Sequence, residues 1–271
     1  MKCFERIVLS HLKSETSGHM DALQFAYQAK RGVEDATVTL MNHVYKHLEP
    51  QKVKGTPSPY VRLLFADFSS AFSTVQVDRL SEKLGSMGVN PILIRWINNF
   101  ITERLQYVHV QGGRSSYIST QTGVPQGSVL APLLFILYIN DLTSHQDYCK
   151  LIKFADDVAL IGLLNDDETS YRAEIDNFHS WCSVNSLILN TKKTKEMVFD
   201  FRKDPAPLTP VTMNNAPIEI VQEYKYLGTI IDSKLTWNAN TNARSAKAQR
   251  RLHFLRKRRS FKVDKTLQIL F

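Results

Sequence analysis

Leu151-Ile152-Lys153-Phe154-Ala155-Asp156-Asp157-Val158-Ala159-Leu160-Ile161-Gly162 places two adjacent carboxylates in the middle of an apolar, partly β-branched run without proline. This pattern predicts a strand, a tight turn and a returning strand. Two like charges at the mouth of a hydrophobic hairpin are costly unless a cation neutralises them, and carboxylate oxygens are ligands that suit Mg²⁺. The pair therefore indicates either a metal site or a polar turn, because Asp is also common in turns for conformational reasons.

The composition is that of a soluble globular protein, with 43% hydrophobic and 22% charged residues in a chain of 271. This length fits one large domain or two modest ones. The longest apolar run, 129–139, contains Pro132 and is too short to span a bilayer. The N-terminus has no secretory pattern, and the three cysteines have no metal-ligand spacing. We therefore expect an intracellular protein, nuclear or cytoplasmic, without a membrane partner.

The net charge of +8 is concentrated at the C-terminal end, where residues 241–271 hold ten basic residues and one acid, Asp264. That segment carries +9, so the other 240 residues sum to −1. Such a tail is typical of proteins that bind a phosphate backbone, although a solvated helix face is the simpler alternative. Ala248, Leu252 and Leu255 recur at helical spacing, which predicts an amphipathic helix with one buried apolar stripe.

Helical and strand-like segments alternate along the chain, which predicts an α/β layer structure. Helices are expected in residues 1–48, 77–84, 94–100, 129–142 and 171–182. Strands are expected at 60–66, within 105–120 around a turn at Gly112-Gly113, on both sides of the Asp pair, and at 187–189, 197–199 and 226–231.

A third carboxylate, Asp67, ends the first predicted strand, 89 positions before Asp156. Strand ends that lie side by side in one sheet can bring such distant residues together. Two converging carboxylate sites are the arrangement that a two-metal phosphoryl-transfer centre needs.

Five segments in this order resemble the palm motifs of reverse transcriptases, and the resemblance is greatest to the LINE-type (non-LTR) retrotransposon enzymes. They are Phe65-Ala66-Asp67-Phe68-Ser69-Ser70-Ala71-Phe72, Gly123-Val124-Pro125-Gln126-Gly127-Ser128-Val129-Leu130-Ala131-Pro132, Phe154-Ala155-Asp156-Asp157, Leu189-Asn190-Thr191-Lys192-Lys193-Thr194 and Tyr226-Leu227-Gly228. The segments Phe4-Glu5-Arg6-Ile7-Val8 and Gln24-Phe25-Ala26-Tyr27 resemble the fingers region of the same group.

The resemblance implies a catalytic role for each matching residue. Asp67 and Asp156 would be the ligands of two Mg²⁺ ions, Asp157 would support the site, and Phe68 would lend its backbone carbonyl. Phe72 matches the family's aromatic steric gate, which excludes a 2′-hydroxyl by a clash. A core aromatic residue is the alternative for Phe72 if the motif is disregarded.

The resemblance also implies contacts to the substrates. Gln126 would touch the incoming nucleotide or the template, and Lys193 would lie near the triphosphate as a general acid or a counter-charge. Tyr226, Leu227 and Gly228 would form the primer grip, although an edge strand that packs on the core is an equally natural alternative for these residues. The basic tail would begin the thumb, and the side chains expected to follow the duplex phosphates are Arg250, Arg251, Arg256 and Arg258.

The implied fold is a right-hand polymerase with an α/β (α+β) palm, partial fingers and a truncated thumb. The expected boundaries are fingers at 1–59, palm at 60–235 with a fingers-like insertion at about 90–122, and thumb at 236–271. The basic fingers hairpin of the family lies upstream of the matched segments, and Gln28 and Ser73 depart from the residues usual in relatives.

The expected reaction is RNA-directed DNA synthesis, in which deoxynucleoside triphosphates extend a DNA primer on an RNA template. Three alternatives remain open at this stage. The chain could be an RNA-templated RNA polymerase, an inactive retroelement-derived fragment that binds nucleic acid, or a decayed fragment that does not fold stably.

Overall fold

The computed structural model describes residues 2–49, 58–203, 205 and 207–261. The chain divides into two compact units, Met1–Val221 and Gln222–Phe271. Within the described ranges, every helix is too short or too polar to cross a lipid bilayer.

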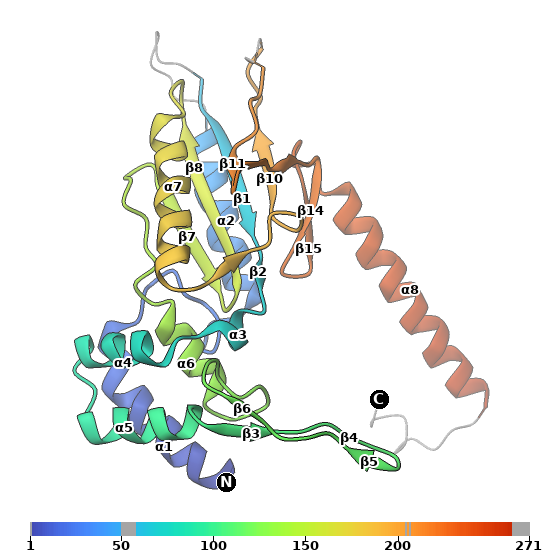
Figure 1. Ribbon diagram of the computed structural model, residues 1–271. Helices are drawn as coiled ribbons and strands as arrows, with labels where there is room; N and C mark the ends of the chain where they lie inside the picture. The colour runs from blue at the N-terminus through green and yellow to red at the C-terminus, as the bar shows by residue number, and fades with distance from the viewer. Residues whose placement is uncertain (1, 50–57, 204, 206, 262–271) are drawn as a thin grey trace. The chain divides into compact units, whose positions relative to one another are not determined.

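A five-stranded sheet with the order β13-β10-β1-β8-β7 forms the centre of the first unit (Figure 1). Its strands are β13 (Glu219–Ile220), β10 (Lys195–Phe199), β1 (Tyr60–Ala66), β8 (Asp157–Leu164) and β7 (Cys149–Phe154). Neighbouring strands are antiparallel except β10 and β13, which are parallel. Every residue of the central strand β1 is buried, as expected for a strand that is covered on both faces.

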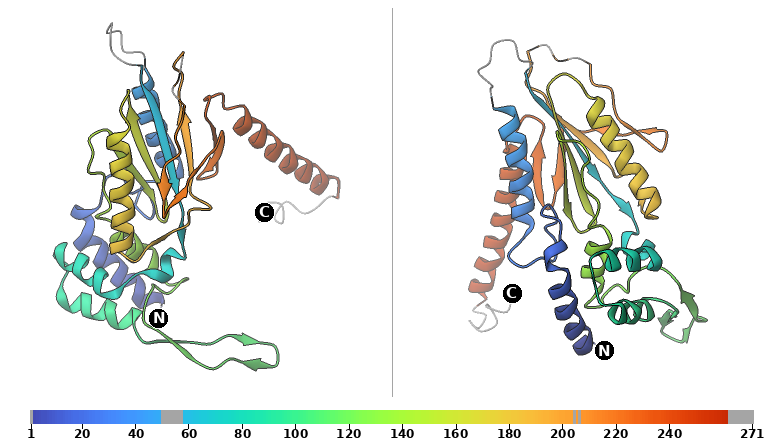
Figure 2. Two further views of the ribbon diagram at one scale, coloured as in Figure 1. Left: turned by 45° about the horizontal axis from the view of Figure 1, so that its top comes forward. Right: turned by 90° about the vertical axis from the view of Figure 1, so that its left-hand side faces the viewer.

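One helix covers each face of this sheet, with α2 (Val33–Leu48) on one side and α7 (Thr169–Val184) on the other, as the right-hand view of Figure 2 shows. A Cβ atom added to Gly162 of β8 would lie 2.4 Å from Cδ2 of Tyr171 in α7. The absence of a side chain at Gly162 therefore lets the aromatic ring rest directly on the strand backbone.

Four helices gather beyond the end of the sheet at which β1 ends: α1 (Lys2–Thr16), α4 (Val77–Ser86), α5 (Pro91–Ile101) and α6 (Ala131–Tyr138) (Figure 1). Every residue of α6 except the half-buried Pro132 is buried, which confirms the buried helix predicted within 129–142. The Ser128 hydroxyl accepts a hydrogen bond from the Ala131 amide in the first turn of α6, and the Glu5 carboxylate accepts one from the Val129 amide just before the helix.

The predicted strands around Gly112-Gly113 form a long two-stranded arm. The pair β3 (Arg104–Gln106) and β6 (Ile118–Thr120) makes its base, and β4 (His109–Val110) and β5 (Gly113–Arg114) make its tip. Gly112 adopts a φ of 92°, a left-handed conformation that suits glycine at the turn.

The second unit holds a hairpin followed by a long helix, and it corrects two predictions. A single strand at 226–231 is wrong, because β14 (Glu223–Tyr226) and β15 (Thr229–Asp232) are separated by a turn in which Leu227 and Gly228 have positive φ. A buried apolar stripe is also wrong: in α8 (Asn238–Ser260) the residues Leu252 and Leu255 are 50% and 51% exposed. Lys262, Asp264 and Lys265 lie outside the described residues.

Candidate active site

The two adjacent aspartates lie at the tip of the β7–β8 hairpin, as the sequence predicts. Phe154 pairs with Asp157 across the hairpin, which leaves Ala155 and Asp156 as the two turn residues. Ala155 adopts a φ of 54°, a conformation that costs a non-glycine residue about 1 kcal/mol or more. The buried strands on both sides hold the turn in this geometry, so both carboxylates are presented at the end of the sheet.

Asp67 lies beside this turn because of the register between β1 and β8. Ala66 pairs with Val158, so one further step along the antiparallel ladder places Asp67 opposite Asp157. The structure therefore brings the three predicted carboxylates, Asp67, Asp156 and Asp157, to one edge of the sheet.

The electrostatics of the site follow from this convergence. The pKa of Asp157 is raised to about 6, mainly by desolvation and in addition by the charges of Asp156 and Asp67. The Oδ2 atom of Asp67 is buried and accepts no hydrogen bond from any described residue. The site thus concentrates negative charge that the surrounding protein only partly neutralises.

The ammonium group of Lys193 faces this cluster, and its Nζ lies 3.6 Å from Asp67 Oδ2. The pairing of β1 with β10 ends at Phe65 and Lys195, and Lys193 belongs to the turn just before β10, which brings its side chain to Asp67. The backbone is fixed there as well, because the Asn190 amide donates to the Asp67 carbonyl and the Thr194 amide donates to the Asn190 carbonyl, both at 2.8 Å.

Phe68, the predicted source of a backbone carbonyl, begins β2 (Phe68–Ser69), which pairs with β9 (Ile188–Leu189). Phe68 itself pairs with Leu189 and is therefore held directly beside the carboxylates by the segment that leads to Asn190.

These residues fit a divalent cation by their chemistry, because they offer several carboxylate oxygens and one of these is buried without a hydrogen bond. No three His, Cys, Asp or Glu side chains of the described ranges are gathered closely enough to hold one ion between them. A divalent cation at this edge is thus a proposal, and it is supported by the chemistry of the carboxylates and by the buried Asp67 oxygen.

Phe72 belongs to the short helix α3 (Ala71–Thr74), and its ring stacks on the buried Phe135 ring of α6 with centroids 4.5 Å apart. The Phe72 carbonyl accepts a hydrogen bond from the Val124 amide. A Cβ added to Gly123 would lie 2.7 Å from the Cα of Ser73, so the two loops are in direct contact. The Phe72 ring is therefore held by α6, and the Phe72 backbone is held by the segment that leads to Gln126.

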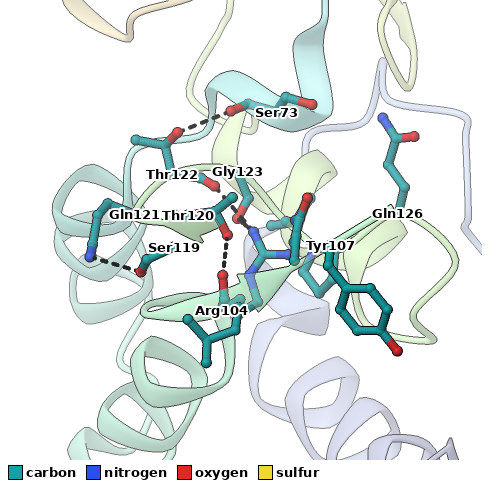
Figure 3. A pocket seen from close by; sticks show the side chains of 13 residues that line it. Ser73, Arg104, Tyr107, Ser119, Thr120, Gln121, Thr122, Gly123 and Gln126 are labelled. Carbon is teal, nitrogen blue, oxygen red and sulfur yellow. Dashed lines mark hydrogen bonds between the residues drawn. The ribbon is translucent and has the colours of Figure 1, made fainter. Parts of the chain in front are cut away.

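Gln126 is exposed and lines a cavity of about 960 Å³. Ser73 lies at one side of this cavity, Tyr107 and Gln126 at another, and Arg104 between them (Figure 3). Arg104 is fixed there, because its guanidinium donates to the carbonyls of Ile101, Thr122 and Gly123. Polar hydroxyl and amide groups therefore dominate the wall beside Gln126.

A buried lysine that supports the Asp156-Asp157 turn was not predicted from the sequence. Lys153 of β7 is fully buried and forms an ion pair with Asp21 at 2.8 Å. Its ammonium also donates to the carbonyls of Ile139, Asn140 and Leu142, at the C-terminal end of α6. A lysine inside an otherwise apolar strand was the only signal that could have suggested this role.

The segment after Asp21 is tied to the same strand. The Phe25 amide donates to the Lys153 carbonyl, and the Lys153 amide donates to the Leu23 carbonyl. The buried Gln24 side chain accepts a hydrogen bond from the Ala155 amide in the turn itself. Tyr27 follows, and its pKa is raised by desolvation and by the Asp156 charge, so its phenol belongs to the site as well.

The remaining predicted site residues belong to the second unit. Tyr226 ends β14, Leu227 and Gly228 form the hairpin turn, and Arg250, Arg251, Arg256 and Arg258 lie on α8. Arg250, Arg251 and Arg258 line one hollow of that helix together with Lys247. Their predicted contacts with primer and duplex stay predictions.

Comparison with known proteins identifies the relatives of the chain. A family model described as reverse transcriptase (RNA-dependent DNA polymerase) matches residues 1–231, and a model described as the N-terminal part of alkylated DNA repair protein alkB homolog 8 matches residues 237–271. The chain is 26% identical to the RNA-directed DNA polymerase from mobile element jockey of Drosophila melanogaster, over 90% of this chain and 27% of that protein. It is 23% identical to a probable RNA-directed DNA polymerase from transposon BS of the same fly, over 94% of this chain and 29% of that protein.

Among solved structures, similar folds occur in telomerase of Candida tropicalis. The apo enzyme truncated from its C-terminal domain aligns with a TM-score of 0.53 and 15% identity, over 87% of this chain and 43% of that chain. The complex with a fragment of telomeric RNA aligns with a TM-score of 0.57 and 12% identity, over 86% of this chain and 36% of that chain. The chain spans about a quarter to a third of the curated relatives it matches, and the structural similarity confirms the predicted polymerase fold.

Proposed function

We propose that this chain, which belongs to the reverse transcriptase (RNA-dependent DNA polymerase) family, extends a DNA primer on an RNA template as the polymerase part of a non-LTR retrotransposon protein. The observation that supports this most directly is the convergence of Asp67, Asp156 and Asp157 at one sheet edge, together with the buried Asp67 oxygen that accepts no hydrogen bond from the described residues.

In this proposal Asp67 and Asp156 hold two Mg²⁺ ions, with the Phe68 carbonyl as a further ligand and Asp157 in support. When bound, the ions would lower the pKa of the primer 3′-hydroxyl and stabilise charge on the entering and leaving oxygens. The carboxylates fix this chemistry at the end of rigid strands, which holds reacting groups more accurately than a loop would. The raised pKa of Asp157 is consistent with a cluster of carboxylates that a bound cation would neutralise.

The chain's other residues then bind and select the nucleotide. Lys193 supplies positive charge next to Asp67, where it can meet the triphosphate and donate a proton to the departing pyrophosphate. Phe72 is fixed on Phe135, and a ring that cannot move aside excludes a 2′-hydroxyl more strictly than a mobile one. Gln126 offers an amide to the nucleotide or to the template base from the loop next to Phe72.

The second unit supplies the duplex contacts in this proposal. Tyr226, Leu227 and Gly228 would form the primer grip, and the arginines of α8 would follow the phosphates.

The salt dependence of duplex binding tests the role of α8. Changing Arg250, Arg251, Arg256 and Arg258 to Ala should reduce the magnitude of the slope of log affinity against log salt by about 3 to 4, since each phosphate contact contributes about 0.9. A variant with Lys at the same four positions keeps the charge and should keep the slope. An unchanged slope in the Ala variant would mean that these arginines make no phosphate contacts and that α8 is a solvated helix face.

Primer extension tests the proposed activity. The purified chain is given a poly(rA) template, an oligo(dT) primer, dTTP and Mg²⁺, and Asp156→Asn is compared with Asp176→Asn. Asp176 lies on the exposed side of α7, so it controls for the loss of one carboxylate. We expect the Asp156 variant to lose at least about 100-fold in rate, the order found when one stabilising group is removed from a polar active site.

The same assay separates the remaining alternatives. Equal extension by the wild type and the Asp156 variant would leave only nucleic-acid binding, as in an inactive retroelement-derived fragment. Preference for ribonucleotides over deoxynucleotides would instead favour an RNA-templated RNA polymerase, against the expectation from Phe72.

A further inference from the structure

One face of the arm formed by residues 104–120 carries an aromatic and basic cluster that no step of the proposed reaction uses. The rings of Tyr107 and Tyr117 meet edge to face with centroids 5.2 Å apart. The Arg114 guanidinium lies over both rings, at 5.4 and 5.2 Å, and donates to the Tyr117 hydroxyl at 3.2 Å. Both rings are nevertheless about half exposed, at 48% and 52%. The three side chains, called the aromatic cluster below, are thus ordered by one another and still open to a ligand.

The strand register shows that the cluster belongs to one face of the arm. Leu105 pairs with Ser119 and Gln106 pairs with Ile118, and side chains of successive residues point to opposite faces. Tyr107 therefore shares a face with Leu105 and Ser119. The opposite face carries Ile118, which is 66% exposed and aliphatic. The two faces differ in chemistry and can be tested separately.

The charge of the arm selects the kind of ligand. No acidic residue occurs between Arg104 and Gln126, and both charged residues of this stretch, Arg104 and Arg114, are basic. Exposed tyrosines offer stacking surfaces for bases, and an arginine between them can stack on a base or meet a phosphate. Unpaired nucleotides need this combination, whereas the bases of a duplex are already stacked on one another.

The cavity beside Gln126 extends from the arm to the loops next to Phe72, the proposed steric gate. Tyr107 lines this cavity from the arm, and Ser73 and Gln126 line it from the loops next to Phe72. Hydroxyl and amide side chains, among them Gln121 and Thr122, complete its wall (Figure 3). Groups of this kind can hydrogen-bond to base edges and to the 2′-hydroxyl that distinguishes RNA from DNA.

We infer that the aromatic cluster of Tyr107, Arg114 and Tyr117 binds unpaired nucleotides of the RNA template and guides them along the cavity toward the catalytic edge. This inference rests on the proposed polymerase function, since it names the path of that reaction's template. Stacking is tolerant of sequence, because every base has a flat face, so such a site can hold each template nucleotide in turn.

Fluorescence anisotropy with labelled RNA–DNA duplexes tests the inference. One duplex carries an unpaired RNA overhang of ten nucleotides on the template strand and the other is blunt. The double variant Tyr107→Ala/Tyr117→Ala should raise Kd for the overhang duplex by about 5- to 150-fold and leave the blunt duplex within about twofold of wild type. The double variant Tyr107→Phe/Tyr117→Phe keeps both rings and should bind like the wild type.

The opposite face provides the matched control. The variant Val110→Ala/Ile118→Ala removes exposed aliphatic side chains from the same arm and should leave both Kd values unchanged. Thermal unfolding midpoints that match the wild type will show that the variants fold. Equal overhang binding by the Ala pair and the wild type overturns the inference. A change in oligomeric state of either variant, measured by light scattering, also overturns it in favour of a protein interface.

The outcome for the arm can be separated from the outcome for the proposed function. Asp156→Asn should abolish primer extension and retain overhang-specific binding. If the wild type fails to extend primers but the tyrosine pair still controls overhang binding, the polymerase proposal fails and the RNA site stands. If extension depends on Asp156 and overhang binding does not depend on the tyrosines, the polymerase proposal stands and this inference fails.

Discussion

Replacing Lys153 by Met should destabilise the first unit more than any other change of a single charge next to the Asp156-Asp157 turn. The ammonium is fully buried and forms an ion pair with Asp21 at 2.8 Å. It also donates to three carbonyls at the end of α6, at 2.6, 3.1 and 3.2 Å. Methionine has nearly the same length and fills the space, so the loss is electrostatic. Removal of one partner from a buried ion pair costs about 3–5 kcal/mol.

Urea unfolding measures this loss against Lys150→Met, which changes a partly exposed lysine of the same strand. With a slope near 2 kcal/mol per molar urea, the Lys153 variant should unfold at a midpoint about 2 M lower, and the Lys150 variant should stay within about 0.5 kcal/mol of wild type. In the double variant Lys153→Met/Asp21→Asn the lost free energies should not add, because both substitutions remove the same ion pair. Equal midpoints for the two single lysine variants would refute the electrostatic support assigned to Lys153.

Three further predictions concern the site and its packing. Phe72→Val should raise incorporation of ribonucleotides relative to deoxynucleotides by roughly 10-fold or more in single-nucleotide extension, because the clash with the 2′-hydroxyl is removed; an unchanged ratio would make Phe72 a core aromatic residue only. Asp157→Asn should stabilise the protein at pH 7 by about 1 kcal/mol, well below the ~3 kcal/mol that the shift alone would give, because this exposed side chain is screened by water. The folded state binds more protons than the unfolded state between the ordinary pKa of 3.8 and about 6, so wild-type stability falls as pH rises through that window, and urea midpoints of the two proteins should coincide below it. Gly162→Ala should cost about 1–3 kcal/mol in thermal unfolding, because the new Cβ would lie 2.4 Å from the buried Tyr171 ring, while Gly85→Ala in open space should cost nothing.

The parts of the fold that follow from local pattern were predictable from the sequence. The Asp156-Asp157 hairpin and the buried helix near 131–138 each come from apolar runs with clear ends, and the structure has both. The convergence of Asp67 with Asp157 needed one more fact, the pairing of β1 with β8. Once that pairing is known the register places the two residues opposite each other. Hydrophobic periodicity predicts where strands occur and which face is buried, but it does not predict which strands pair. The order of the motifs was therefore needed to predict that Asp67 lies near the Asp pair.

The second unit shows where local pattern misleads. Residues 226–231 are strand-like in composition except for Gly228, and the chain reverses at Leu227-Gly228 because two successive residues adopt positive φ. A helical repeat of Leu252 and Leu255 likewise predicted a buried stripe, but both side chains remain half exposed. Apolar spacing indicates which residues can be buried together, and it does not provide the surface that would bury them.

Buried charges were the main feature that the sequence could not predict. Arg62 and Glu196 are both fully buried on neighbouring strands and pair through two hydrogen bonds of 2.8 and 2.9 Å, although 134 residues separate them. The Tyr171 hydroxyl donates to the same Glu196 carboxylate. In the sequence each of these residues is an ordinary polar residue, because its partner is set by tertiary structure alone. A buried charge without its partner is costly in free energy, so the Arg62–Glu196 pair favours one alignment of β1 with β10.

The proposed function requires a fixed catalytic edge and an adaptable template path, and the buried pairs bear on the first requirement. Lys153 holds the hairpin behind Asp156, and Arg62 with Glu196 fixes the strand that ends at Asp67, so the carboxylates are positioned by interactions that are costly to break. The arm that carries Tyr107 and Tyr117 has no such support, and its side chains order one another at the surface. A polymerase must keep its reacting groups in place while the template advances by one nucleotide in each cycle. Rigid strand ends meet the first need, and stacking contacts that accept any base meet the second.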